Sequence, residues 1–131
     1  MIIINDEYVT LDTPTGPMRT HIVRPAAPGR YPGILFYSEI FQITAPIRRT
    51  AAMLAGHGYV VAMPEIYHES EPAGTILAYD QAGSDRGNFL KTDKPVAAYD
   101  ADGVLCERAA AAYVWSAAWS AILMRACSRA C

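Results

Sequence analysis

The stretch that decides the fold is Tyr31–Glu69, which reads YPGILFYSEIFQITAPIRRTAAMLAGHGYVVAMPEIYHE. It contains two short apolar runs, Ile34–Tyr37 and Tyr59–Met63, and turn-forming residues bound both of them. Short apolar runs between turn residues are typical of strands buried in a sheet. The stretch therefore predicts two buried strands with a longer segment between them.

That intervening segment has the pattern of a helix. Thr44 or Ala45 suits the N-cap and Pro46 suits the first turn. Gly58 suits the left-handed position after the helix end. Apolar residues recur at helical spacing and would face a sheet: Ile47, Ala51 and Leu54. Two apolar strands joined by a helix form a βαβ unit, in which the strands pair in parallel.

Two more strands are predicted before this unit, at Glu7–Leu11 and Met18–Val23. The residues between them are rich in proline, threonine and glycine, so the two strands form a hairpin at the edge of the sheet. The predicted fold class is therefore α/β, with an edge hairpin followed by a parallel βαβ unit.

The chain after the second parallel strand is less regular. Ser70–Lys94 is polar and contains three glycines, which predicts a long excursion with a short helix near Ile76–Gln81. Pro95 opens a further helix over Val96–Val104, although Gly103 weakens that helical pattern.

Each parallel strand is followed by a carboxylate. Glu39 comes after the first strand and Glu65 after the second. Ligands of open α/β sheets bind in the crevice beyond the carboxyl ends of the strands. This edge is therefore the predicted site, and a solvated loop is the alternative for each acid.

The quoted stretch resembles the dienelactone hydrolase family of α/β-hydrolases. The motifs are Ser-Glu-Ile-Phe after a strand, an Ile-Arg-Arg helix, Gly-Tyr-Val-Val and Pro-Glu-Ile-Tyr, and the likeness runs from Asn5 to Asp102. It implies an α/β-hydrolase fold over this part of the chain. It also implies hydrolysis of a small-molecule ester or lactone by nucleophilic acyl transfer, with no cofactor and no metal.

The resemblance also implies roles for individual residues. Glu39 matches the carboxylate that helps to activate a nucleophilic thiol, and the backbone N–H of Ile40 matches one of two oxyanion-hole donors. Phe41 and Tyr67 are the candidate residues of the substrate pocket. Gln42 stands where the family has glycine.

A further departure concerns the substrate. Some members of the family carry an arginine shortly after the tyrosine of Pro-Asp-Leu-Tyr, and it binds a substrate carboxylate. Here Tyr67 is followed by His-Glu-Ser-Glu, residues 68–71, so an acidic substrate is not expected.

The nucleophile of the family lies in Gly-x-Cys-x-Gly, a tight strand-to-helix turn. No such motif occurs in the 131 residues, and Cys106, Cys127 and Cys131 lack the flanking glycines. The family's catalytic Asp and His also have no counterpart. We therefore expect a chain truncated before the nucleophile and inactive alone. A non-catalytic, partner-binding fragment is one alternative. An unrelated nucleotide-binding α/β protein is disfavoured because no glycine-rich phosphate loop follows Ile34–Tyr37.

The last segment departs from the family pattern near Gly103. Ala109–Met124 is alanine-rich and uncharged, with Trp115 and Trp119 on one helical face. Its length is short of the ~20 apolar residues that span a bilayer. We expect a partial hydrolase domain over 1–102 and an atypical helical tail over 103–131, from a reading-frame change or a truncation. The open sheet edge or the Trp115/Trp119 face would allow self-association.

Several polar residues have a structural role as the default. His21 is expected to be half-exposed in a strand, and His57 to serve the helix C-terminus. His68 lies in a carboxylate-rich loop, which is usually solvated, and the spacing matches no zinc pattern. Asp100 and Asp102 are expected on an exposed helix face.

Composition excludes several classes of protein. The net charge is −2, from 11 basic and 13 acidic residues, and no basic patch with interleaved aromatics indicates nucleic-acid binding. The N-terminus lacks the basic start of a signal peptide. Three cysteines do not make a disulfide framework, so a reducing cytoplasm is expected.

Overall fold

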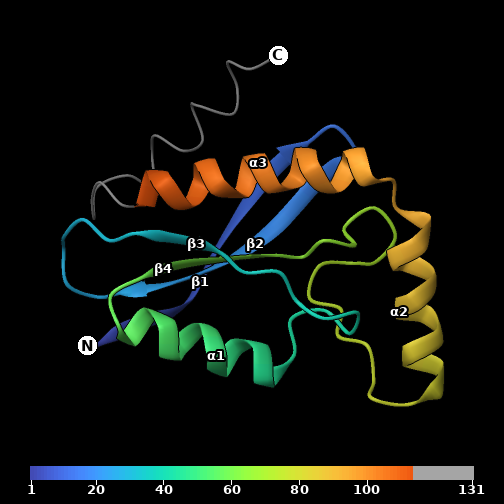
Figure 1. Cartoon of the computed structure of the whole chain (residues 1–131), viewed down its shortest axis with the longest axis horizontal. Coiled ribbons are helices and arrows are strands. Elements are labelled where there is room, and N and C mark those ends of the chain that lie inside the picture. The colour runs from blue at the N-terminus through green and yellow to red at the C-terminus, as the bar shows by residue number, and fades with distance from the viewer. Residues whose placement is uncertain (114–131) are drawn as a thin grey trace.

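The computed structural model describes residues 1–113, with side chains to residue 110. These residues form a four-stranded sheet with three helices (Figure 1). The strand order is β1-β2-β4-β3. The strands are β1 (Ile3–Thr13), β2 (Gly16–Pro25), β3 (Gly33–Leu35) and β4 (Val60–Pro64).

The predicted hairpin is confirmed, with longer strands than the sequence indicated. β1 pairs antiparallel with β2 at the edge of the sheet, and the turn between them needs only Pro14 and Thr15. Gly16 begins β2 with φ 124°, a backbone conformation that favours glycine. The pairing of β2 with β4 is also antiparallel and joins the hairpin to the βαβ unit.

The βαβ unit is confirmed as well. β3 and β4 pair in parallel, and α1 (Ala45–Gly56) connects them. Thr44 is the N-cap, and Gly58 follows the helix with φ 94°. His57 places Nδ1 2.8 Å from the Met53 carbonyl oxygen, so it serves the helix C-terminus as predicted.

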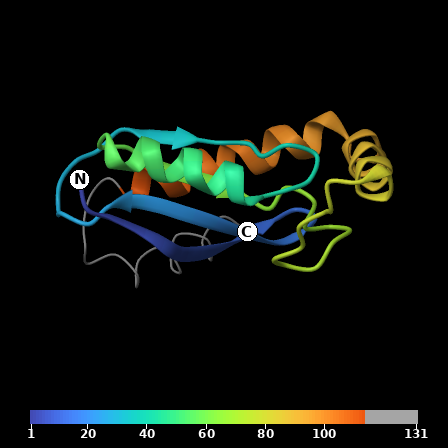
Figure 2. The ribbon, with the colours of Figure 1, turned by 90° about the horizontal axis from the view of Figure 1, so that it is seen from below.

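Two helices cover opposite faces of the sheet (Figures 1 and 2). The alternation of β4 side chains shows why, because successive residues of a strand point to opposite faces. Val61 and Met63 pack in one cluster with residues of α1, whereas Val60 and Ala62 pack in another with Ala110 of α3. β4 is buried along its whole length, as a central strand between two helical layers must be.

The chain between β4 and α3 differs from the prediction. A helix was expected near Ile76–Gln81, but α2 spans Gln81–Asp93 and begins where that helix was expected to end. Asp80 caps α2 by accepting a hydrogen bond from the Gly83 N–H at 2.7 Å. In the sequence, Gly83 and Gly87 favour a loop, but both lie within α2 and are buried.

α3 (Val96–Tyr113) also runs beyond the predicted end at Val104. Gly103 does not interrupt it, because the helix packs there against Tyr37. A Cβ atom on Gly103 would lie 2.6 Å from the Tyr37 hydroxyl oxygen. The helix is continuous across the expected boundary between residues 102 and 103, and the division into two parts stays a prediction.

The expectations for Trp115, Trp119, Cys127 and Cys131 lie outside the described residues. Within residues 1–113, no helix has the length and apolarity that crossing a membrane requires.

Candidate active site

The carboxyl ends of β3 and β4 lie at the same end of the sheet, beside α2 (Figure 1). The loop from β3 to α1 and the loop from β4 to α2 both begin there. The sequence placed Glu39 and Glu65 at this edge, and each does follow its strand. The surroundings of the two carboxylates differ, since Glu39 is exposed whereas Glu65 is 5% exposed.

Glu39 begins a tight turn that ends at Gln42. The Gln42 N–H donates to the Glu39 carbonyl oxygen at 3.1 Å, and the Thr44 N–H donates to the Gln42 carbonyl oxygen at 2.9 Å. In a trans peptide the C=O and the N–H point in opposite directions. Because the Glu39 C=O is held toward Gln42, the Ile40 N–H points out of the turn.

The predicted site residues of this loop are therefore consecutive and close to solvent. The Glu39 side chain is exposed, and Ile40 and Phe41 are half-buried. Within residues 1–113 the Ile40 N–H donates no hydrogen bond to the protein. The loop thus presents a carboxylate and an unused backbone donor side by side.

The Phe41 ring packs on a partner that sequence analysis missed. Its centroid lies 4.5 Å from that of Tyr79, whose hydroxyl donates to Thr44 Oγ1 at 3.0 Å. The Leu77 N–H donates to the Phe41 carbonyl oxygen at 3.1 Å. The segment before α2 therefore braces the Glu39–Gln42 turn. No local pattern signals this pairing, because the partners lie 35 or more residues apart.

Tyr67, the other candidate pocket residue, follows β4. It is 5% exposed and packs in the core with Leu11, Met18 and Cys106. Burial and, to a lesser extent, the neighbouring Tyr99 raise the pKa of its phenol to about 12. Phe41 thus lies in the same turn as Glu39, whereas Tyr67 is buried in the core, and the pocket roles of both residues stay predictions.

Glu65 is the centre of a buried ionic group, contrary to the expectation that it could be a solvated loop acid. Its Oε1 lies 2.7 Å from Arg19 Nη2 and 2.9 Å from His21 Nε2, and its Oε2 accepts the Gly74 N–H at 2.9 Å. His21 is 3% exposed, so the expected half-exposed position is wrong.

The pKa of Glu65 reflects these partners. Burial alone raises it, but the hydrogen bonds from His21, the Gly74 N–H and Arg19 outweigh burial and lower the pKa to about 2. Glu65 is therefore ionised at neutral pH and joins β2 to the loop that follows β4. Its role here is structural.

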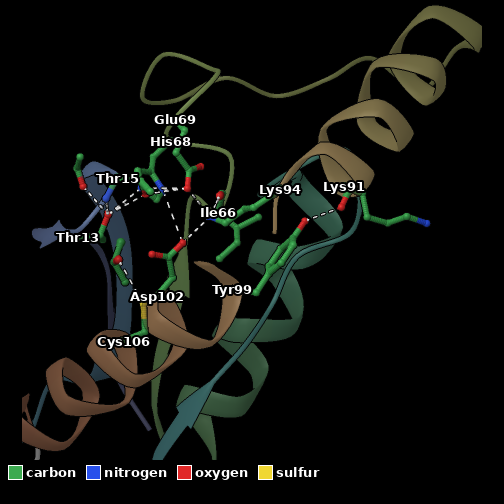
Figure 3. A network of polar contacts seen from close by, with 12 residues as sticks. Thr13, Thr15, Ile66, His68, Glu69, Lys91, Lys94, Tyr99, Asp102 and Cys106 are labelled. Atoms are coloured by element: carbon green, nitrogen blue, oxygen red, sulfur yellow. Dashed lines mark hydrogen bonds and ion pairs between the residues drawn. The ribbon is translucent and has the colours of Figure 1, made fainter. Parts of the chain in front are cut away.

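A second polar group surrounds His68 (Figure 3). The His68 side chain is 4% exposed, and Nε2 lies 3.0 Å from Thr13 Oγ1 and 3.1 Å from Thr15 Oγ1. Asp102 is 1% exposed and lies 4.0 Å from His68 Nδ1. The predictions of a solvated His68 and an exposed Asp102 are wrong, because His68 lies between Asp102 of α3 and the threonines of the hairpin turn. Asp100 is exposed as expected.

The ligand atoms of His68, Glu69 and Asp102 lie within 4.8 Å of one another, which would suit a metal ion. The ammonium group of Lys94 already lies among these three side chains. Lys94 Nζ is 2.9 Å from Glu69 Oε1, contacts Asp102 Oδ2 and donates to the Ile66 carbonyl oxygen. The ammonium contacts both carboxylates and balances one of their two negative charges, so a metal ion would have to displace it and this donor set does not fit a metal ion in addition.

Of the three cysteines, Cys106 lies within the residues that the structure describes. Its surroundings do not suit a nucleophile. The thiol is fully buried, with Sγ 3.7 Å from Thr20 Oγ1. Burial raises its pKa to about 11, so almost no thiolate forms at neutral pH.

The sequence pattern of the dienelactone hydrolase family matches residues 18–118 of this chain. The chain belongs to the dienelactone hydrolase family. The match begins at the third residue of β2 and continues past Gly103, where the likeness of the quoted motifs ends.

Two relatives show how much of the family's length is present. A Saccharomyces cerevisiae protein named "Putative carboxymethylenebutenolidase" is 37% identical over 110 residues, which are 80% of this chain and 40% of the yeast protein. A crystal structure of a "Putative Dienelactone Hydrolase" from Klebsiella pneumoniae superposes with a TM-score of 0.72 at 24% identity, over 89% of this chain and 47% of that chain. This chain therefore spans less than half the length of these relatives and has the α/β-hydrolase fold over that part.

Gln42, at the end of the turn that begins at Glu39, has an unusual backbone conformation. Its φ is 70°, in the left-handed region that favours glycine. Gln42 is 1% exposed, and its Oε1 has no hydrogen-bond partner in the described part of the chain.

Proposed function

We propose that the loop after β3 forms part of an acyl-transfer site that hydrolyses carboxylic esters or lactones. Glu39 is the carboxylate that helps to activate a thiol, and the Ile40 N–H is an oxyanion donor. The observation that carries the proposal is the turn that holds the Glu39 C=O toward Gln42 and leaves the Ile40 N–H pointing outward. A fixed donor beside an exposed carboxylate is what this chemistry requires.

The chemistry proceeds through a tetrahedral intermediate. A thiolate adds to the carbonyl carbon, and the negative charge develops on the carbonyl oxygen. A backbone donor that is already oriented stabilises that charge without reorganising during the reaction. The Ile40 N–H is free to act in this way because it makes no internal hydrogen bond within residues 1–113.

The nucleophile, its base and the orienting acid would come from residues outside this sequence. The 131 residues contain no Gly-x-Cys-x-Gly, and the described cysteine, Cys106, is buried as a thiol. The chain covers 40% of the yeast relative. We therefore propose that the chain alone does not turn over esters and that it supplies one wall of the complete site.

A chimera tests this proposal. Residues 1–113 would replace the matched segment of the yeast relative, and hydrolysis of p-nitrophenyl acetate would be measured for the chimera and for the 131-residue chain. We expect turnover by the chimera only. Glu39→Gln should lower kcat of the chimera by at least about tenfold, whereas Glu107→Gln, at an exposed position of α3, should not.

Three outcomes would overturn the proposal. A folded chimera without activity would show that this loop does not complete the site. An active chimera that tolerates Glu39→Gln would remove the role of the carboxylate. Turnover by the 131-residue chain alone would place a nucleophile within it.

A further inference from the structure

α2 approaches the candidate active-site loop through glycine. Its buried residues are Gly83, Gly87 and Leu90. A Cβ atom on Gly87 would lie 2.6 Å from the Ile40 carbonyl oxygen and 2.9 Å from the Ile40 Cβ. Both distances are shorter than real Cβ contacts allow, and the closer atom belongs to the backbone, which cannot rotate away. Only glycine fits at position 87 without moving the loop.

The contact with Gly87 complements the hydrogen bonds of the turn. The peptide before Ile40 is held by the Gln42 N–H, which bonds to the Glu39 carbonyl oxygen. The peptide after Ile40 has its carbonyl oxygen against Gly87. One residue further, the Phe41 carbonyl oxygen accepts the Leu77 N–H. Three consecutive peptide groups are thus fixed, and α2 supplies the contact for the middle one.

We propose that Gly87 is a positioning residue for the oxyanion donor, an inference that rests on the proposed function. The absence of a side chain lets α2 lie against the Ile40 carbonyl, so that the Ile40 N–H keeps one direction. A side chain at position 87 would push the Ile40–Phe41 peptide away from α2 and turn the donor. A displacement of about 1 Å can cost roughly 100-fold in rate when a catalytic group depends on orientation.

The first test uses the 131-residue chain and needs no activity. In the ¹⁵N-labelled protein, Gly87→Ala should shift the Ile40 amide resonance more than any other resonance outside α2. Gly56→Ala is the matched control, since Gly56 is also helical and a Cβ there meets nothing within 4 Å. It should leave the Ile40 resonance in place.

A second control separates positioning from stability. Leu90→Ala removes a buried side chain from the same face of α2, so it destabilises the packing without adding an atom next to Ile40. It should move the Ile40 resonance less than Gly87→Ala does. An equal or larger movement would show that Gly87 acts only through stability and would overturn the proposal.

If Gly87→Ala does not fold, the unmodified protein still provides a test. The close packing predicts a nuclear Overhauser contact between the Gly87 α-protons and the protons of Ile40. Absence of that contact in the folded chain would overturn the proposal.

The functional test uses the chimera described above. Gly87→Ala should lower kcat by roughly 10- to 100-fold with little change in KM, because the donor acts on charge that develops in the transition state. The proposed function fails if Glu39→Gln leaves the chimera active. The role of Gly87 alone fails if the chimera depends on Glu39 but keeps its kcat in Gly87→Ala.

Discussion

At the scale of single residues, Glu65 shows how a carboxylate at a strand end can serve the fold instead of the chemistry. Replacing it by glutamine would leave Arg19 and His21 without their counter-charge. We expect Glu65→Gln to lower the free energy of unfolding by about 3–5 kcal/mol at pH 7, the range for breaking a buried ion pair. Urea denaturation measures this value. An unchanged free energy of unfolding in Glu65→Gln would mean that the Glu65 carboxylate is solvated and not part of a buried ion pair.

The same carboxylate predicts a dependence on pH. The folded chain holds the pKa of Glu65 near 2, whereas its ordinary value is 4.5. Because the unfolded chain takes up this proton at higher pH, the stabilisation is complete above pH 4.5 and is lost as pH falls toward 2. Denaturation at a series of pH values should show this slope in the original chain and a flatter one in Glu65→Gln.

Gln42 offers a gain in stability. Gln42→Gly relieves the left-handed backbone, worth about 1 kcal/mol, and removes a buried unpaired oxygen, worth about 1–3 kcal/mol. It also loses two buried methylenes, at about 0.8 kcal/mol each. We expect a net gain of about 1 kcal/mol in the free energy of unfolding. Gln42→Ala keeps a Cβ in the left-handed region and should be less stable than Gln42→Gly; the reverse order would contradict the strain argument.

At the scale of elements, Lys94 joins the end of α2 to the start of α3. Its side chain is 5% exposed and lies between Glu69 and Asp102. Lys94→Met would leave two carboxylates without a cation, so we expect a loss of about 3–5 kcal/mol in the free energy of unfolding. Lys91→Met, at an exposed position of α2, is the matched control and should change it by less than about 0.5 kcal/mol. A similar loss of unfolding free energy in both variants would show that the contacts of Lys94 with Glu69 and Asp102 do not stabilise the fold.

The elements also show what the sequence could and could not predict. The βαβ unit was predictable because apolar runs, a proline at the helix start and a glycine after its end are local signals. α2 was misplaced because its glycines look like a loop, although Gly83 and Gly87 are needed where the helix meets Ala78 and Ile40. Close approach between distant segments has no local signature.

The candidate site likewise contains residues that the sequence could predict and residues that it could not. Roles for Glu39 and Ile40 could be predicted by resemblance, since they lie in one continuous motif, and these roles stay predictions. Tyr79, Gly87, and the burial of His68 and Asp102 could not, because each depends on a contact across the fold. Buried polar groups are paired through tertiary structure, and spacing along the chain does not report those pairs.

At the scale of the whole molecule, β3 leaves one edge of the sheet open within the described residues. The Val60 N–H donates to the Pro32 carbonyl oxygen and the Phe36 N–H donates to the Ala62 carbonyl oxygen. In a parallel pair, alternate residues face the neighbouring strand, so the backbone groups of Gly33 and Leu35 face outward. Tyr37, which follows this strand, is 44% exposed. We propose that two copies of the chain pair along this edge.

Leu35→Pro tests that pairing. Proline removes the outward N–H of residue 35 and leaves the bonds to β4 in place, so an approaching strand loses a donor. We expect sedimentation velocity to show concentration-dependent dimers of the original chain and monomers of Leu35→Pro. Leu35→Ala, which loses a similar side chain but keeps the N–H, should still form dimers. Monomers of Leu35→Ala as well would show that the side chain, not the open backbone edge, joins the two copies, and monomers of the original chain would remove the pairing altogether.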